Sequence, residues 1–441
     1  MSVGRSVSYL EVMKEVMKME RIQFSNFRCF GDYSIKFKPS VNLLFGANGS
    51  GKTTVLKGLK VVMSSFFSGF SDVNTRFIGI ANNDFMSEVD NDMETLERPV
   101  SIDYDFSGYP NLTVSRTGKK NRTSIAGLKS LRDYGRKLYQ QLAAADDGSI
   151  ELPLFAAFST EDIHSSRKLD RGIFAKYSQP RSFGYYECLQ GDGFFDYWMH
   201  RLLVLAEGQK SLREIETVSN AISQALGANG CNIISGMTIR PIKKKVFFHY
   251  IDGREVESDN LSDGYKRIVN IVINLAIRCC LLNGKTFGQD CCRLTSGVVL
   301  VDEIDQHLHP ELQLKVLNSL HGTFPKLQFV VSSHAPLVMS SVKTDENNQV
   351  LHLQYKDEAY RISHISTYGL DASTILELNM GSRSRVAEVG DHLKHLFDLI
   401  DEDHYQDAKE ELHNLEDKFG DTIPELIQAR TMLDLNLENG D

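Results

Sequence analysis

A glycine-rich segment near the N-terminus limits what this chain can fold into more than any other feature of the sequence. Residues 46–54 read GANGSGKTT and follow the apolar run at 41–45, which is typical of a buried strand. Three glycines allow backbone N–H groups to curl around an anionic oxygen where side chains would obstruct the turn. A helix is expected to begin at about Lys52 and to add the partial positive charge of its N-terminus. The segment therefore predicts an α/β protein with a phosphate-binding loop.

Side chains of this loop have specific partners in a nucleoside triphosphate. Lys52 is expected to reach the β- and γ-phosphates, and the Thr53 hydroxyl to ligate Mg²⁺. We therefore expect the chain to bind ATP together with Mg²⁺. The residues of this loop predicted to bind the nucleotide are Asn48, Gly49, Ser50, Gly51, Lys52, Thr53 and Thr54.

Two acidic residues close a second apolar run, at 298–301. Such a run is typical of a central parallel strand, and ligands of parallel sheets lie at the carboxyl ends of the strands. Asp302 is expected to hold Mg²⁺ through water, and Glu303 to orient and deprotonate the attacking water. The phosphate-binding loop upstream disfavours the alternative, a buried strand followed by ordinary surface acids.

Two further segments complete the set of candidate site residues. Residues 261–267 read LSDGYKR and precede a long helical pattern, so Ser262 and Gly264 form a second candidate anion site at a helix N-terminus. Taken alone, Ser-Asp-Gly is also an ordinary turn and helix cap. The apolar run at 329–333 leads into His334, whose imidazole is expected to donate to a γ-phosphate oxygen at a neighbouring strand end.

The four segments occur in the order of Walker A, signature, Walker B and switch histidine in the ABC-type ATPase heads of SMC, RecF and OLD proteins, which this chain resembles. The resemblance implies that two heads sandwich the nucleotide, with Ser262 and Gly264 contacting the γ-phosphate bound to the other head. The active form would then be a homodimer or a multiple of dimers.

The same resemblance assigns further roles. It implies slow ATP hydrolysis with Lys52, Glu303 and His334 as catalytic residues. It also brings Arg28, at the end of an Asn-Phe-Arg run, toward the nucleotide. The signature differs from the Leu-Ser-Gly-Gly-Gln of transporters, and the glutamine that lines the metal site cannot be assigned.

Details of the motifs indicate a subgroup within these ATPases. Residues 302–313 and 333–336, with the tail from Tyr368 onward, resemble PtuA, the ATPase subunit of the Septu anti-phage defence system, over about 19–433. The resemblance implies that the chain regulates a partner HNH endonuclease of the PtuB type. The chain itself has no His-Asn-His cluster and no Toprim-like carboxylate set after His334, so nuclease activity would come from the partner.

Two other functions stay open at this point. A RecF- or SMC-like DNA-repair ATPase would act on DNA ends, and a nucleotide-stabilised scaffold would turn over little because its signature is altered. DNA contact through the partner or through the basic loops at 116–122 and 240–245 is an alternative to ordinary solvated turns. The roughly 210 residues between loop and signature contain no heptad run, so long coiled-coil arms are not expected.

Composition disfavours several other classes of protein, namely globally basic, secreted, membrane-spanning and cysteine-metal proteins. The 441 residues carry a net charge of −9, so any contact with nucleic acid must come from local patches. No secretory or membrane-spanning pattern is seen, and the apolar run at 268–282 carries a polar stripe that indicates a buried helix. The seven cysteines include two adjacent pairs but no C-x-x-C spacing, which favours reduced thiols in a cytoplasmic protein over a metal site.

We expect three regions along the chain. They are an N-terminal extension at 1–18, an ABC-type head at 19–383 with a helical lobe at about 123–285, and a C-terminal helical module at 384–441. The head should have a mixed sheet core. Its strands outside the motifs are expected at 21–24, 34–37, 100–106, 112–116, 152–158, 350–355 and 359–365. Residues 64–97, polar and punctuated by glycine, are interpreted as a mobile insertion.

Overall fold

The computed structural model describes residues 17–86, 98–144, 146–159, 171–209, 212–381 and 385–438. The chain divides into two compact units, Met1–Asp371 and Ala372–Asp441. The first is the head. The expected boundaries at 18 and 383 stay a prediction, and most of the N-terminal extension lies outside the described residues.

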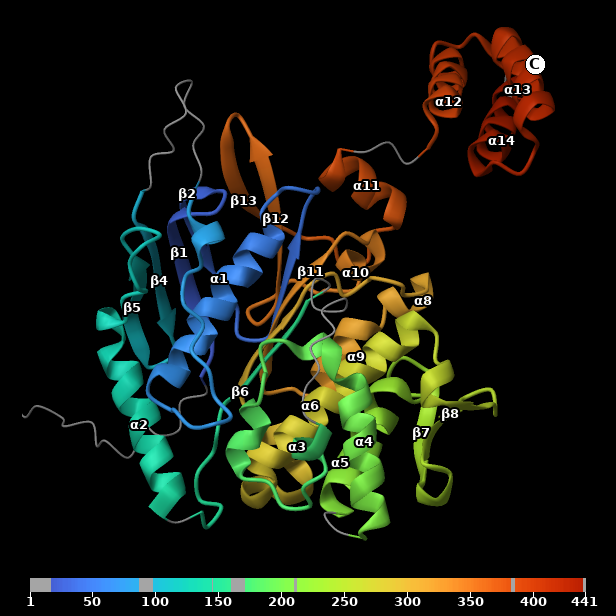
Figure 1. Ribbon diagram of the computed structural model, residues 1–441. Helices are drawn as coiled ribbons and strands as arrows, with labels where there is room; N and C mark the ends of the chain where they lie inside the picture. The colour runs from blue at the N-terminus through green and yellow to red at the C-terminus, as the bar shows by residue number, and fades with distance from the viewer. Residues whose placement is uncertain are drawn as a thin grey trace, which may run out of the picture. The chain divides into compact units, whose positions relative to one another are not determined.

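A six-stranded mixed sheet forms the core of the head (Figure 1), with the strand order β13-β12-β3-β11-β10-β6. All neighbours pair in parallel except the hairpin of β12 and β13. Strands β3, β6, β10 and β11 are buried along their whole length, as continuous apolar runs in parallel sheets are. The strands are β3 (Val41–Phe45), β6 (Leu154–Phe158), β10 (Gly297–Val301), β11 (Leu327–Ser333), β12 (Gln349–Lys356) and β13 (Ala359–Ile365).

Two antiparallel sheets accompany the core. The first has the order β2-β1-β4-β5 and the second β7-β8-β9. Helix α1 (Lys52–Ser64) contacts β1, β4 and β11, and so packs between the first of these sheets and the core sheet. The strands are β1 (Met19–Phe27), β2 (Phe30–Lys36), β4 (Val100–Phe106), β5 (Tyr109–Arg116), β7 (Ile234–Arg240), β8 (Lys245–Tyr250) and β9 (Glu255–Glu257).

Helices cluster between the phosphate-binding loop and the acidic strand (Figure 1), and the β7-β8-β9 sheet lies in the same stretch of the chain. Among the described residues, one helical stretch, Asp263–Leu294, has the length and hydropathy of a membrane span, and 94% of its most apolar window is buried inside the head. The remaining head helices are α2 (Lys129–Ala144), α3 (Arg171–Phe174), α4 (Phe195–Glu207), α5 (Leu212–Leu226), α6 (Asp263–Phe287), α7 (Cys291–Leu294), α8 (Pro310–Gln313), α9 (Val316–Thr323) and α10 (Pro336–Ser340).

The polar stripe of α6 confirms the prediction of a buried helix. Asn274 and Arg278 are fully buried. The Arg278 guanidinium donates to the Asn274 side chain (2.6 Å) and to the carbonyl oxygens of Gly184 (2.7 Å) and Tyr186 (3.0 Å). The stripe therefore binds the backbone of a neighbouring loop inside the core.

Two local predictions were wrong. The turn expected at 107–111 has only two residues, because β5 begins at Tyr109, which pairs with Phe106, and Gly108 adopts a φ of 76°. Residues 64–86 are not a loose insertion, since Phe66, Phe70 and Phe85 are buried against the head. Clustered aromatic side chains outweigh the polar composition of that segment. The rest of the expected insertion, 87–97, lies outside the described residues.

The second unit consists of helices α11 (Ala372–Met380), α12 (Ala387–Asp401), α13 (Tyr405–Phe419) and α14 (Pro424–Glu438). Leu396, Leu412 and Leu426 belong to one buried cluster contributed by α12, α13 and α14. These three helices thus have a small core of their own. Val386, directly before α12, is 73% exposed.

Candidate nucleotide site

Three adjacent parallel strands bring the predicted motifs to one edge of the core sheet. Strand β11 lies between β3 and β10. Phe45 is opposite Ser333, and Val301 is opposite Val331. The residues that follow these strands are the phosphate-binding loop, His334 and the acidic pair. The structure therefore places these motifs side by side, as the sequence predicted.

The phosphate-binding loop forms a tight turn with positive φ at Gly49 and Gly51. The Lys52 ammonium donates to the carbonyl oxygens of Gly46 (2.8 Å) and Ala47 (3.0 Å). A Cβ atom on Gly51 would lie 2.5 Å from the ring of Phe30, and the φ of 97° at Gly51 also requires glycine. The Ser50 hydroxyl is buried and has no hydrogen-bond partner. A glycine-rich turn before a helix N-terminus, with a buried and unsatisfied hydroxyl, fits a bound phosphate chain.

Lys52 lies in an electrostatically unusual position. Its side chain is 5% exposed, and burial lowers its pKa to about 8 although Asp302, Glu303 and Asp305 act in the opposite direction. A buried ammonium with little solvation gains more from an anionic ligand than a solvated one does. The lysine is thus prepared to bind a phosphate oxygen.

The acidic pair is held by Ser332 of the neighbouring strand, a residue that the motifs did not indicate. The Ser332 hydroxyl donates to the buried Asp302 carboxylate (2.5 Å) and accepts from the backbone N–H of Glu303 (2.8 Å). Glu303 adopts a φ of 50°, which is uncommon for a residue other than glycine and is often found at functional sites. Carboxylate and hydroxyl oxygens are the donors that Mg²⁺ prefers, so Asp302 and Thr53 fit this ion.

The signature segment lies where the sequence indicated. Ser262 is the N-cap of α6, with extended backbone angles, and Gly264 follows in the first turn. A Cβ atom on Gly264 would meet the carbonyl oxygen of His307 at 2.1 Å. Packing within its own head therefore requires glycine at position 264. The interpretation of this segment as an anion site did not include that role.

Arg267 on the same helix was also missed, although its motif was recognised. This residue is 7% exposed, and its guanidinium donates to the carbonyl oxygens of Asp302 (2.5 Å) and Glu303 (2.7 Å). It also donates to the Gln306 side chain (2.8 Å). The signature helix thus braces the backbone that carries the acidic pair.

His334 occupies the end of β11, beside the phosphate-binding loop. Burial, and secondarily Lys52, lower the pKa of its imidazole, against the influence of Asp305, Glu303 and Asp302. At neutral pH the ring is therefore neutral and presents one N–H donor. A neutral donor suits the proposed hydrogen bond to a phosphate oxygen.

Arg28 has a partner that the resemblance did not include. Its guanidinium forms an ion pair with Asp84 (3.1 Å), and its backbone N–H donates to the Asp84 carbonyl oxygen (2.8 Å). The adjacent Cys29 thiol lies 3.6 Å from the Thr54 hydroxyl, so this turn contacts the helix of the phosphate-binding loop. Arg28 is thus near the site, with its side chain directed to Asp84.

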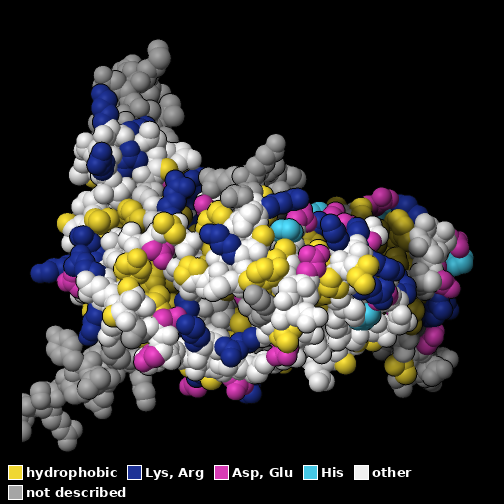
Figure 2. All heavy atoms as spheres, turned by 60° about the horizontal axis from the view of Figure 1, so that its bottom comes forward, with side chains coloured by type: hydrophobic (Ala, Val, Ile, Leu, Met, Phe, Trp, Pro, Cys, Tyr) yellow, Lys and Arg dark blue, Asp and Glu magenta, His cyan; other side chains and the backbone are white. Residues whose placement is uncertain are grey.

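Three basic side chains of the two basic loops, Arg116, Arg240 and Lys245, bind other parts of the head. Arg116 donates to the carbonyl oxygen of Ile80 (2.6 Å) and to the Asn82 side chain (2.8 Å). Arg240 pairs with Glu255, and Lys245 with Glu257 and Asp259. On the face shown in Figure 2, basic side chains are dispersed among acidic and hydrophobic ones. DNA contact through these loops stays a prediction.

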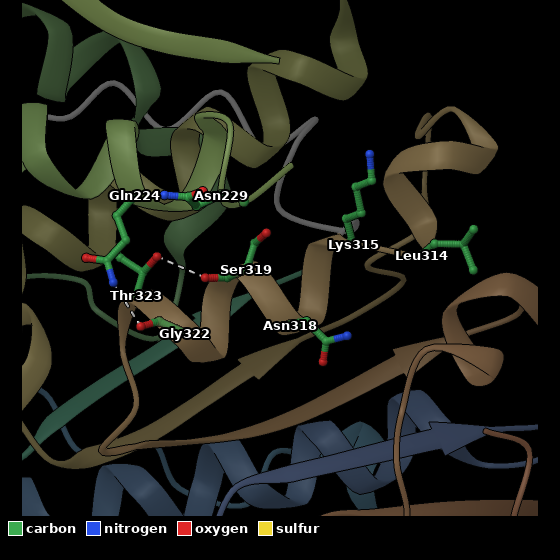
Figure 3. Close-up of a pocket in the computed structure, with 9 residues that line it drawn as sticks. Gln224, Asn229, Leu314, Lys315, Asn318, Ser319, Gly322 and Thr323 are labelled. Atoms are coloured by element: carbon green, nitrogen blue, oxygen red, sulfur yellow. Dashed lines mark hydrogen bonds between the residues drawn. The ribbon is translucent and has the colours of Figure 1, made fainter. Parts of the chain in front are cut away.

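A hollow of about 530 Å³ lies between the end of α5 and α9 and contains none of the predicted site residues (Figure 3). Two side chains that line the hollow form hydrogen bonds. The Gln224 amide donates to the carbonyl oxygen of Gly322 (3.0 Å), and the Thr323 hydroxyl donates to that of Ser319 (2.9 Å). The lining of the hollow follows α9 from Leu314 and Lys315, just before the helix, to Thr323 at its end.

Within the described residues, no group of three or more His, Cys, Asp or Glu side chains could hold a metal ion. The seven cysteines are free thiols, six buried and Cys29 partly exposed.

A mixed α/β head with a phosphate-binding loop, an acidic strand end and an adjacent histidine defines a P-loop ATPase of the ABC type. The sequence model for the family described as "AAA domain, putative AbiEii toxin, Type IV TA system" matches residues 41–340, and the chain belongs to this family.

Two relatives and one solved structure illustrate the similarity to individual proteins. The probable ATPase of retron Vc95 from Vibrio cholerae serotype O1 biovar El Tor is 26% identical over 448 residues, 87% of this chain and 84% of that protein. The Septu protein PtuA of Bacillus mycoides (strain KBAB4) is 28% identical over 183 residues, 40% of this chain and 24% of that protein. A solved SMC head bound to the C-terminal winged-helix domain of ScpA is 15% identical, with a TM-score of 0.44, and the match covers 79% of this chain and 97% of that one.

Proposed function

We propose that this protein is the ATP-hydrolysing subunit of a bacterial anti-phage defence complex, dimerises through its nucleotide sites and regulates a partner nuclease. The observation that carries the proposal is the meeting of Lys52, Asp302 and Glu303 at one sheet edge. The buried lysine and the glycine-rich loop suit a phosphate chain, and the glutamate with a φ of 50° suits a water-activating base.

Each residue then has one task. Lys52 and the backbone N–H groups of the loop hold the phosphates, while Thr53 and Asp302 hold Mg²⁺. The metal ion, when bound, neutralises the charge that develops on the phosphate oxygens. Glu303 accepts a proton from the attacking water, and the neutral His334 donates to the γ-phosphate.

The second head completes the site in this proposal. The N-terminus of α6, with Ser262 as its cap, offers backbone donors and a partial positive charge to a phosphate of the partner head. The partner's α6 would do the same in return, which gives a two-fold symmetric dimer.

The relatives support the defence role. One is the probable ATPase of a retron, and another is a Septu protein. The match to the retron protein covers more of this chain. The resemblance to PtuA implies an HNH endonuclease of the PtuB type as the partner. We therefore propose a nuclease partner, with this chain as the nucleotide-dependent regulator in the cytoplasm.

Co-purification with the product of the adjacent reading frame tests the proposal. ATP turnover and plasmid cleavage are measured together, with wild type and with Glu303→Gln. We expect a stable complex whose cleavage depends on nucleotide and whose ATP turnover is lost in the variant. A lone dimer whose turnover is stimulated by DNA would favour the repair ATPase, and tight ATP binding with no turnover would favour the scaffold.

A further inference from the structure

Two tyrosines face each other at the tip of the hairpin formed by β12 and β13. Tyr355 and Tyr360 are directly opposite in the strand register, with ring centroids 4.9 Å apart. The two-residue turn between the strands holds Asp357 and Glu358 at φ values of 53° and 59°. This tight turn fixes the register, so the ring pair is held in one place.

The exposure of this pair is uneven. Tyr355 is 59% exposed, whereas the ring of Tyr360 packs edge-on against Phe30, with centroids 5.1 Å apart. Cross-strand aromatic pairs also stabilise hairpins, which is the structural explanation of the pair. Stabilisation of the hairpin requires contact between the two rings. It does not require that Tyr355 is exposed to solvent.

The pair lies beyond the sheet edge that carries the phosphate-binding loop. Strand β12 runs parallel to β3, and the carbonyl oxygen of Leu353 lies 2.1 Å from where a Cβ of Gly46 would be. Tyr355 is two residues further along, beyond the same edge of the sheet. Its neighbour Tyr360 has a pKa raised to about 12 by burial and by the Cys29 thiol, which in turn contacts Thr54.

The direction of a bound triphosphate follows from the loop. Lys52 and Thr53 take the β/γ end, so the α-phosphate lies toward Thr54 and the sugar and base leave the loop on that side. Cys29 links Thr54 to the tyrosine pair on this side. An exposed ring beside the exit of the base is positioned to stack on it.

We propose that Tyr355, supported by Tyr360, is the stacking platform for the base of the nucleoside triphosphate held by the phosphate-binding loop. The proposal rests on the nucleotide binding proposed above. Stacking uses the π-face that every base has, so the platform should contribute to affinity without selecting between ATP and GTP.

Equilibrium titration with ATP, GTP and inorganic tripolyphosphate, each with Mg²⁺, tests this role. Tyr355→Leu removes the aromatic face and keeps an apolar side chain, whereas Tyr355→Phe keeps the face. Tyr368→Leu is the matched control, because Tyr368 is 57% exposed and lies after β13, outside the pair. Thermal melting of each variant verifies that the fold is retained.

We expect Tyr355→Leu to weaken ATP and GTP binding about tenfold, as loss of a base–aromatic stack does, with tripolyphosphate binding unchanged. Tyr355→Phe and Tyr368→Leu should bind all three ligands as wild type does. Unchanged ATP affinity in Tyr355→Leu, or an equal loss for tripolyphosphate, would overturn the platform. Wild type that binds neither ATP nor tripolyphosphate would instead refute the proposed function, and the platform with it.

Discussion

Replacement of Arg267 by methionine is the sharpest test of what stabilises the backbone of the acidic pair Asp302 and Glu303. The guanidinium makes three hydrogen bonds, two of them to the carbonyl oxygens of Asp302 and Glu303. Hydrogen bonds from charged donors contribute about 1.5–3 kcal/mol each. Because methionine recovers part of the apolar contact of the arginine stem, we expect a net loss of about 2–4 kcal/mol in the free energy of unfolding.

The effect on catalysis should be larger than the effect on binding. Glu303 adopts a φ of 50°, and Arg267 binds its carbonyl oxygen and that of Asp302, so the substitution acts first on the backbone of the acidic pair. A displacement of about 1 Å in a catalytic group costs about 100-fold in rate. We expect kcat for ATP to fall about 100-fold in Arg267→Met while the Kd for ATP changes less than threefold.

Two controls make the test decisive. Arg267→Lys keeps the charge but cannot bridge three acceptors with a planar fork, so its kcat should lie between those of wild type and Arg267→Met. Arg254→Met removes an exposed arginine from the loop between β8 and β9 and should change neither kcat nor Kd. A folded Arg267→Met protein with wild-type kcat, or an equal loss of ATP affinity, would refute the bracing role.

Mixed dimers separate this role from that of Ser262. Arg267 contacts the acidic pair of its own chain, whereas Ser262 is proposed to serve the nucleotide of the other head. Arg267→Met and Ser262→Arg on the same chain, paired with wild type, should leave no complete site. The same two changes on opposite chains should leave one complete site and measurable turnover. Equal activity in the two arrangements would contradict the division of roles.

Three further changes have defined outcomes. Glu303→Gln should lower kcat at least about 100-fold without loss of ATP binding, and single-turnover hydrolysis at the wild-type rate would exclude the proposed base. Gly264→Ala should lower the melting temperature and abolish turnover because its Cβ would overlap the His307 carbonyl oxygen, whereas Gly322→Ala, with nothing within 4 Å, should raise helix stability by up to about 1 kcal/mol. Leu396→Ala should cost the C-terminal helices about 2–5 kcal/mol, seen by chemical denaturation, and unchanged ATP affinity would agree with their separate core.

The edge of the core sheet was predictable because each motif follows an apolar run. A run such as 298–301 can only be a buried parallel strand in this context, and its carboxyl end must then lie beside the ends of its parallel neighbours. This argument requires that the strands are parallel and share one sheet, and it does not require their exact order. Asp302, His334 and Lys52 were therefore placed together correctly without any knowledge of distances.

Contacts between distant segments could not be predicted in the same way. Ser332 reads as one more position of an apolar strand, and its role appears only when β10 lies beside it. Asp84 falls in a segment whose polar composition suggested a loop, yet it holds Arg28 through both its carboxylate and its carbonyl oxygen. Such partners are determined by tertiary packing, which a single sequence does not show.

The signature segment shows where a motif can be placed correctly and explained incompletely. Ser-Asp-Gly was interpreted as an anion site, but Gly264 is also the residue that lets α6 approach the carbonyl oxygen of His307. One helical turn later, Arg267 binds the backbone of the acidic pair. The N-terminus of α6 and the loop after β10 are therefore one packed block. Because a packed block moves as a unit, displacement of α6 by a partner's nucleotide would also displace Glu303 in its own head, which couples the two proposed sites of a dimer.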